Sequence, residues 1–257
     1  MRYQGSKTKM KKTIKEFVEG NIKKNQTYVE PFVGGCNSFS EINHPNKIGC
    51  DTNQYLIDMW EEIKKNNFNP PQNVSEELYY DIKNDCITNG DKYSNALKAY
   101  VGFACSYGSG WWNGYAHYNE RKNEDHIKEA RNGLIKQIER FKNLSNSTFI
   151  NCDYKTLELP NKSFIYCDPP YANTKQYANS FDNNEFWEWC RNKVNEGHTL
   201  LISEYNAPDD FICIWSKEMQ DGMKSINGKK VEKLFIHKSQ IKHFKNINKN
   251  NLTLSYR

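Results

Sequence analysis

Residues 163–171 read SFIYCDPPY, an apolar run that ends in an aspartate, two prolines and a tyrosine. The run is short and is bounded by turn residues, which is typical of a buried strand. The two prolines hold φ near about −65° and remove two backbone donors, so the chain has to leave the sheet there. The stretch therefore predicts that Asp168 lies at the carboxyl end of a strand, on the side of the sheet where its parallel strands end.

Further apolar runs of this kind alternate with stretches whose apolar residues recur at helical spacing. This alternation is typical of a parallel sheet covered by helices, an α/β fold. Strands are expected at 27–32, 47–51, 147–153, 163–171 and 198–205. Helices are expected at 9–20, 54–65 and 183–197. The runs 211–217 and 229–238 predict a hairpin that turns through 221–229.

This pattern is interrupted between residues 66 and 146. Residues 66–73, NNFNPPQN, have the composition of a linker, and residues 100–125 are rich in glycine and aromatic side chains without a clear period. We therefore expect one α/β domain formed by 1–65 and 147–257. A small, mainly helical insertion is expected at 66–146.

The composition favours a folded protein of the reducing cytoplasm. The 257 residues include 36 basic and 31 acidic ones, and the net charge of +5 permits nucleic-acid binding without requiring it. Eight scattered cysteines form no CxxC pair and no Cys/His cluster, so no zinc site is expected. No apolar run approaches the ~20 residues of a membrane span, and no signal peptide is expected. His44 and His198 are interpreted as surface or turn residues.

Two glycines and an aspartate follow the first two expected strands. Gly34 and Gly35 lack Cβ atoms, so the backbone can turn sharply there and let a ligand approach. Asp51 ends the next strand, where nucleotide-binding sheets place a carboxylate that accepts hydrogen bonds from ribose hydroxyls. The alternatives are an ordinary strand-to-helix turn for the glycines and a helix N-cap role for Asp51.

The tetrapeptide at residues 168–171 also suggests a chemistry. Its main-chain carbonyls act as acceptors that no neighbouring strand uses, because proline has no N–H. The Asp168 carboxylate completes an acceptor-only pocket, which suits a planar group that bears NH2, and the Tyr171 ring could stack on that plane. A rigid exit loop would explain the prolines but neither the aspartate nor the tyrosine.

In the order of its motifs the chain resembles the Dam-type (D12 class) DNA adenine-N6 methyltransferases. RYQGSK at 2–7 resembles the amino-terminal motif of the family, PFVGGCNSF at 31–39 its cofactor loop, and YCDPPY at 166–171 its catalytic tetrapeptide. LISEY at 201–205 and NGKKVEKLFIHK at 227–238 resemble its late segments. The resemblance implies a Rossmann-like class I methyltransferase sheet, mostly parallel with an antiparallel C-terminal hairpin.

The resemblance also implies S-adenosylmethionine as the cofactor and double-stranded DNA as the partner. The α/β domain would then bind the cofactor and carry out catalysis, and the insertion at 66–146 would recognise the target. Gly34 and Gly35 would line the methionine end of the cofactor, and Asp51 would hold its ribose. The implied cofactor-binding residues are Tyr3, Lys7, Pro31, Phe32, Gly34, Gly35, Asp51, Asp153, Tyr154 and Asp168. No metal is implied.

Catalysis is expected at Asp168, Pro169, Pro170 and Tyr171. The lone pair of adenine N6 is delocalised into the ring, so the amine attacks poorly unless its hydrogens are held. Asp168 and the Pro169 carbonyl would accept these two hydrogens and aim the lone pair at the methyl group. Because the amine is paired and stacked inside a duplex, the base would have to flip out and stack on Tyr171.

The insertion departs from the pattern of the family. Only NGYAHYN, residues 113–119, resembles the reading loop of GATC-specific members, so no target sequence is predicted. Trp111 and Trp112 are assigned to a buried aromatic core, and Arg121 and Lys122 to phosphate contacts. The implied DNA-binding residues are Tyr115, His117, Tyr118, Asn119, Arg121, Lys122, Tyr177, Lys229 and Lys230.

Two further departures lie in the cofactor motifs. Tyr3 stands where tryptophan is more usual in the family, and it still offers a ring. Cys36 stands where glycine or alanine is usual, and it narrows the loop slightly. Neither departure abolishes the resemblance.

Alternatives to adenine methylation remain open at this point. A methyltransferase for another planar amine, such as cytosine N4, would need the same acceptor pocket. A catalytically silent DNA-binding module of the same fold is the second alternative, and the intact set of Tyr3, Lys7, Gly34, Asp51 and Asp168 argues against it. A cognate restriction endonuclease is one candidate partner.

Overall fold

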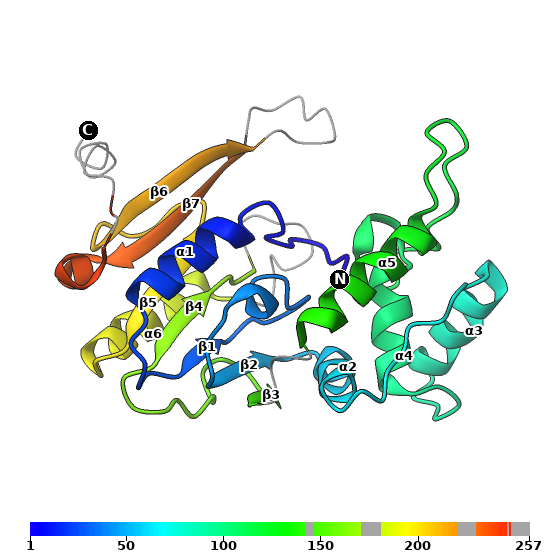
Figure 1. Cartoon of the computed structure of the whole chain (residues 1–257), viewed down its shortest axis with the longest axis horizontal. Coiled ribbons are helices and arrows are strands. Elements are labelled where there is room, and N and C mark those ends of the chain that lie inside the picture. Colours follow the sequence, from blue (N-terminus) through cyan, green and yellow to red (C-terminus); the bar gives the residue numbers. More distant parts are fainter. Residues whose placement is uncertain (142–145, 171–180, 220–229, 246, 248–257) are drawn as a thin grey trace. The chain divides into compact units, whose positions relative to one another are not determined.

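The computed structural model describes residues 1–141, 146–170, 181–219, 230–245 and 247 (Figure 1). The strands are β1 (Tyr28–Glu30), β2 (Lys47–Asp51), β3 (Ser147–Asn151), β4 (Phe164–Cys167), β5 (Thr199–Glu204), β6 (Phe211–Met219) and β7 (Lys230–His237). In the described part of the chain they form a seven-stranded sheet with the order β3-β2-β1-β4-β5-β7-β6. This α/β sheet confirms the predicted fold class.

The sheet combines parallel pairs with an antiparallel hairpin. β1 pairs in parallel with β4, β2 with β3, and β4 with β5. β7 runs antiparallel to both β5 and β6, as predicted for the C-terminal hairpin. The turn expected at 221–229 lies outside the described residues.

β4 is enclosed by the sheet and its covering layers. All four of its residues are buried, as a parallel strand covered on both faces requires. Ile165 is in register with Val29 of β1 and with Leu200 of β5. The hydroxyl of Tyr166 is satisfied inside this core by Ser203 Oγ at 2.8 Å. The pairing with β1 and with β5 therefore fixes the point at which the chain leaves the sheet after β4.

The described helices are α1 (Lys11–Asn21), α2 (Gln54–Lys64), α3 (Glu76–Ile87), α4 (Asn95–Ala99), α5 (His126–Phe141) and α6 (Asn183–Asn195). Three of them, α1, α2 and α6, begin and end close to the predicted positions, and α3, α4 and α5 lie in the insertion. Shorter turns are η1 (Phe39–Glu41), the π-helical η2 (Tyr100–Ala104), η3 (Tyr107–Ser109) and η4 (Lys238–His243). The N-cap of α2 is Asn53, whose side chain accepts a hydrogen bond from the Leu56 N–H at 3.2 Å. The N-cap alternative for Asp51 is therefore wrong.

The chain divides into two compact units. Unit 1 comprises Met1–Lys15 and Val33–Asp153, and unit 2 comprises Glu16–Phe32 and Tyr154–Arg257. In unit 1 the Trp60 ring stacks on Phe141 with centroids 5.3 Å apart. The core of unit 2 is built on β4, β5 and α6. The predicted insertion at 66–146 falls wholly within unit 1, where α3, α4, η2 and α5 make it mainly helical.

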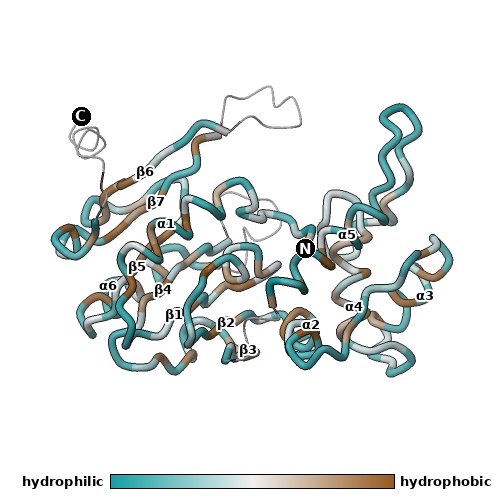
Figure 2. The backbone as a smooth tube through the Cα atoms, viewed as in Figure 1, coloured by the Kyte–Doolittle hydropathy of each residue, from teal (hydrophilic) through white to brown (hydrophobic). Residues whose placement is uncertain are grey.

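Hydropathy distinguishes the core strands from a projecting loop (Figure 2). Hydrophobic residues lie along β4 and β5, whereas the loop that projects just before α5 is hydrophilic. This loop contains the antiparallel bridge between Asn119 and Glu124. Among the described helices, none is long and apolar enough to cross a membrane. The described residues also contain no group of three His, Cys, Asp or Glu side chains that could hold a metal ion.

His44 and His198 are buried, with 8% and 5% of their surfaces exposed, so the expectation of surface histidines is wrong. His198 lies at the amino end of β5, and its Nδ1 accepts a hydrogen bond from the Ser163 N–H at 3.0 Å. His44 Nδ1 lies 3.1 Å from the Asn46 carbonyl oxygen. Each histidine lies in a connection shortly before a strand, β2 for His44 and β5 for His198, and its imidazole bonds a backbone group there.

The stability of unit 2 should depend on the protonation of His198. Burial lowers the pKa of this imidazole, and the nearby Glu196 charge opposes the shift only in part. The folded state therefore favours the neutral ring. Its contribution to stability is complete above the unfolded pKa of about 6.5 and is lost as the pH falls through the folded pKa.

We expect the free energy of unfolding, measured by urea denaturation, to fall more steeply below about pH 6.5 in the native protein than in His198→Gln. The difference in slope should reach at most about 1.4 kcal/mol per pH unit, the value for one proton. His117→Gln, at an exposed position, is the control for the substitution itself. Equal slopes in the native protein and His198→Gln would contradict this account.

Candidate active site

Residues 33–36 form a tight loop in unit 1. Val33 N–H donates to the Cys50 carbonyl at 2.8 Å, and Gly34 has φ of 43°, a conformation that favours glycine. A Cβ on Gly34 would lie 2.8 Å from Tyr3 Cε1, and one on Gly35 would lie 2.7 Å from Tyr3 Cβ. The glycines are therefore required because the Tyr3 side chain lies directly on the loop.

Side chains from three elements satisfy the buried backbone groups of this loop. Gly34 N–H donates to Asp51 Oδ2 at 2.9 Å, and Trp60 Nε1 donates to the Gly34 carbonyl at 2.9 Å. Gln137 Nε2 donates to the carbonyls of Gly35 and Cys36, each at 2.9 Å. The loop is therefore held in one conformation by β2, α2 and α5.

Asp51 occupies the carboxyl end of β2, as predicted. Its Oδ1 accepts the Asn53 N–H at 2.9 Å, while Oδ2 accepts the Gly34 N–H. Burial raises the pKa of this carboxyl group, and the backbone donors counteract part of the rise. The side chain is only half-buried. Because an ionised carboxylate has about four acceptor positions, lone pairs remain for ligand hydroxyl groups.

The amino-terminal motif links the loop to the insertion. The Tyr3 ring lies 5.0 Å from the Phe103 ring, which in turn lies 4.6 Å from the Trp111 ring. Gln4 N–H donates to the Ser109 carbonyl at 3.1 Å. Trp112 is buried and packs 5.2 Å from Trp111, so the predicted aromatic core is confirmed.

Two other predicted cofactor-binding residues lie in unit 1. Lys7 is buried, and its ammonium nitrogen is 3.4 Å from the Gly5 carbonyl oxygen. Asp153 is half-buried and follows β3 by two residues.

In unit 2, Asp168, Pro169 and Pro170 follow directly on β4. Asp168 and Pro170 are half-buried, and Pro169 is buried. Pro31 and Phe32 follow β1, the parallel neighbour of β4. Because parallel neighbours end at one edge of a sheet, both segments leave the sheet on the same side. The structure thus brings these five predicted residues to one edge of unit 2.

Phe32 and Tyr154 belong to an aromatic cluster in unit 2. Their ring centroids are 5.1 Å apart, and the Phe32 centroid is 5.8 Å from that of Phe186. Trp189 lies edge-on to Tyr154 at 5.3 Å. Tyr154 is buried in this cluster, whereas Phe32 is half-exposed. Phe32 therefore offers more ring surface to a flat ligand than Tyr154 does.

Two buried glutamates near this edge were not predicted from the sequence. Glu30 ends β1 and accepts a 2.6 Å hydrogen bond from the Tyr28 hydroxyl. Glu204 ends β5, and its Oε1 accepts the Tyr205 N–H at 2.8 Å. Burial, the Asp168 charge and the Glu30 charge raise the pKa of Tyr166 well above its usual range, so this phenol stays neutral. Each glutamate is an acidic residue at the end of an apolar run, and this sequence feature could have predicted both.

Gln137 and Trp60 were also not predicted. Gln137 is the one polar position in the buried stripe of α5, which otherwise contains Ile127, Ala130, Leu134 and Phe141. A glutamine at a core position of an amphipathic helix predicts a specific buried hydrogen bond, and this was the readable signal. Nothing in its pattern distinguished Trp60 from an ordinary core residue.

The predicted DNA-binding residues of the insertion differ in exposure. Tyr115 donates to the Val74 carbonyl at 2.7 Å and packs 5.7 Å from Tyr79, so it supports the fold. Tyr118 is 52% exposed, and its hydroxyl bonds the Asn123 side chain. His117, Arg121 and Lys122 are also exposed, and Asn119 is half-buried.

Some predicted residues cannot be placed. Tyr171, Tyr177 and Lys229 lie outside the described residues. Lys230 is described only through its backbone, which pairs with Met219.

The strand order, the antiparallel hairpin and the carboxylates that end β2 and follow β4 define a Rossmann-like class I methyltransferase. Residues 3–199 match the model of the D12 class N6 adenine-specific DNA methyltransferase family. This chain belongs to that family. The adenine specificity of the family decides against the cytosine-N4 alternative.

Curated relatives carry the same activity in their names. The DNA adenine methylases of Salmonella typhi and of Salmonella typhimurium strain LT2 are each 25% identical to this chain over 223 residues, which cover 74% of this chain and 76% of each relative. A crystal structure of SMU.472 complexed with SAH aligns with 92% of this chain at 12% identity and a TM-score of 0.35. The chain spans about half, 54%, of that structure.

As a family member the chain is an S-adenosylmethionine-dependent DNA adenine methyltransferase. The residues of unit 1 fit such a cofactor. Asp51 is a half-buried carboxylate with acceptor capacity left for ribose hydroxyls, and it adjoins a loop whose backbone is held by Asp51 and Trp60. A preformed loop of this kind lowers the entropic cost of ligand binding.

Gln137→Leu should loosen the glycine loop. The change leaves the Gly35 and Cys36 carbonyls without their donor, which should lower the free energy of unfolding by about 1–3 kcal/mol. Affinity for S-adenosylmethionine should fall with it, as measured by calorimetry. Lys136→Leu, at the exposed neighbouring position of α5, is the control. Unchanged stability and unchanged cofactor affinity in Gln137→Leu would show that Gln137 does not position the glycine loop.

Proposed function

We propose that this enzyme flips an adenine out of duplex DNA and methylates N6 with Asp168 and Pro169 as the acceptors that hold the amine. The observation that carries the proposal is the position of Asp168–Pro170 immediately after the buried strand β4. At that position the carboxylate is half-buried, so it is accessible yet partly shielded from water. Shielding strengthens its interaction with a bound amine.

The two acceptors each bind one hydrogen of the amine. The Asp168 carboxylate accepts one N6 hydrogen, and the Pro169 carbonyl accepts the other. Both contacts draw the nitrogen toward tetrahedral geometry and direct its lone pair away from the ring. Pro169 and Pro170 have no N–H, so neither proline adds a backbone donor beside the two acceptors. Tyr171 remains a sequence-based proposal for the stacking platform of the flipped base.

We propose the same cofactor contacts as the sequence implies, with Phe32 as the main aromatic surface. Asp51 holds the ribose, and Tyr3, Gly34 and Gly35 shape the methionine end. Lys7, Pro31, Asp153 and Tyr154 complete the set. When bound, S-adenosylmethionine supplies an electrophilic methyl group on a sulfonium.

The insertion at 66–146 is proposed to recognise the target, with the rest of the chain, 1–65 and 147–257, as the catalytic domain. Exposed residues of the loop before α5 suit DNA: Tyr118 as a base or wedge contact, and Arg121 and Lys122 as phosphate contacts. His117, Asn119 and, at the edge of the fold, Tyr115 complete this surface. Tyr177, Lys229 and Lys230 are proposed as further contacts. A cytoplasmic location and a cognate restriction endonuclease fit the same function.

Asp168→Ala should abolish methyl transfer and leave cofactor binding largely intact. Without the carboxylate the amine is misaligned, and we expect kcat to fall at least about 100-fold. The assay incubates the protein with labelled S-adenosylmethionine and mixed-sequence duplex DNA, followed by digestion to nucleosides. Label is expected in N6-methyladenine. Label in N4-methylcytosine, or near-normal turnover by Asp168→Ala, would overturn the proposal.

Asp51→Ala should weaken S-adenosylmethionine binding, because the ribose loses its acceptor. We expect the dissociation constant from calorimetry to rise about 10–100-fold, equivalent to about 1.4–2.8 kcal/mol. The variant also loses two side-chain contacts to backbone N–H groups, so its urea denaturation curve is measured in parallel. Asp58→Ala on α2 is the control. Unchanged affinity would assign the ribose to another residue.

A further inference from the structure

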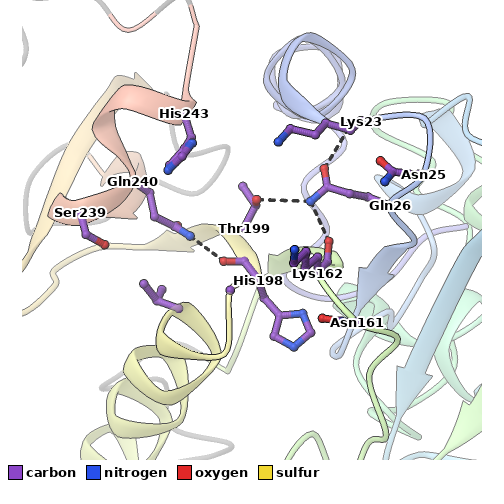
Figure 3. A pocket seen from close by; sticks show the side chains of 12 residues that line it. Lys23, Asn25, Gln26, Asn161, Lys162, His198, Thr199, Ser239, Gln240 and His243 are labelled. Carbon is purple, nitrogen blue, oxygen red and sulfur yellow. Dashed lines mark hydrogen bonds between the residues drawn. The ribbon is translucent and has the colours of Figure 1, made fainter.

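Unit 2 contains a polar cavity of about 500 Å³ at the amino ends of its parallel strands (Figure 3). Lys23 and Gln26 come from the segment after α1, and Lys162 from the turn before β4. His198 precedes β5, while Gln240 and His243 belong to η4. Four chain segments thus converge on one cavity.

This cavity is distinct from the candidate active site. Lys162 precedes β4, whereas Asp168 follows it. The two are six positions apart, which corresponds to ~20 Å along an extended chain. The cavity and the catalytic aspartate therefore lie at opposite ends of the same strand.

Buried amides make the walls of the cavity rigid. Gln26 is 6% exposed, and its Nε2 donates to the Lys162 carbonyl at 2.7 Å while its Oε1 accepts the Lys23 N–H at 2.9 Å. Gln240 is also 6% exposed, donates to the His198 carbonyl at 2.6 Å and accepts the Leu200 N–H at 3.1 Å. The cavity is therefore preformed, since its walls are bonded to one another.

The side chains that remain available to a ligand are mainly donors. Lys23, Lys162 and His243 line the cavity, and the described residues provide no ion-pair partner for them. None of the twelve lining residues is acidic. The nearby Glu196 is paired with Lys193 at 2.8 Å and with His198 Nε2 at 3.5 Å. The electrostatic character of the cavity is therefore cationic.

The lining also restricts the kind of anion. It contains amides, hydroxyls and lysine cations, and its only rings are the imidazoles of His198 and His243, so it offers a nucleobase no Phe, Tyr or Trp face. Lysine ammonium groups bind phosphate as point charges, and amides and hydroxyls suit a hydroxylated carbon chain. A volume of about 500 Å³ is in the range of small-molecule sites.

We propose that this cavity is a second binding site, one that takes the phosphate group of a small hydroxylated phosphomonoester. Lys23 and Lys162 bind the phosphate, and the rigid amide walls set its position. The site is independent of methyl transfer, so it does not rest on the proposed catalytic roles.

The experiment titrates the full-length protein with inorganic phosphate and with ribose 5-phosphate by calorimetry at constant ionic strength. Saturable binding is expected, tighter for ribose 5-phosphate. The double variant Lys23→Ala/Lys162→Ala should weaken binding at least 10-fold. Both side chains are exposed, and retained methyl transfer shows that the variant is folded. Lys9→Ala/Lys136→Ala, which removes the same charge from exposed sites in unit 1, is the matched control.

Each outcome bears on the proposal. Absence of saturable binding, or equal binding by the two double variants, would overturn it. If neither small phosphate binds but the cavity variant loses affinity for duplex DNA with a shallower salt dependence, the phosphate belongs to the DNA backbone and the small-molecule site is overturned. Loss of methyl transfer in Asp168→Ala would leave the phosphate titration unchanged, which keeps the two proposals separable.

Discussion

The carboxyl ends of parallel strands lie on the same side of a sheet, and this constraint sets the positions of the aspartates that end or follow the strands in both units. In unit 1, β2 ends at Asp51, and its parallel partner β3 leads into Asp153. In unit 2, β4 leads into Asp168 beside its parallel neighbours β1 and β5. A cysteine precedes each of the three aspartates. Cys50 and Cys167 are the buried next-to-last and last residues of their strands, Cys152 follows β3 and is half-buried, and each aspartate comes next in the chain.

Satisfaction of buried backbone groups determines the rest of unit 1. Gly34 and Gly35 have no room for side chains, because Tyr3 covers them. The polar groups of the glycine loop therefore need donors and acceptors from elsewhere, and Asp51, Trp60 and Gln137 supply them. Since Gln137 belongs to α5, the predicted recognition insertion and the cofactor loop share a hydrogen-bond network. A displacement of α5 would break or lengthen the hydrogen bonds from Gln137 to the loop.

The sequence allowed the strands and the residues at their ends to be predicted, because periodicity and turn residues are local signals. Asp51 and Asp168 lie where the motifs put them. Long-range partnerships were not predictable in the same way. His198 is buried because the Ser163 N–H needs an acceptor, and these two residues are 35 positions apart. The partners of Gln137, Gly35 and Cys36, are more distant still, 102 and 101 positions away, although the presence of a glutamine in an apolar stripe was a visible sign of a buried bond.

Cys36 shows how a departure from the family pattern can be tolerated. Its φ of 52° lies in the left-handed region, where a residue other than glycine is strained by about 1 kcal/mol or more. The side chain is fully buried, and burial of a small apolar group contributes a stabilisation of about the same size. Its N–H donates to the Val33 carbonyl at 2.8 Å, and its carbonyl accepts from Gln137. The conformation is thus imposed from both sides of the residue. A strained cysteine persists here because the neighbouring hydrogen bonds hold the loop in this one conformation.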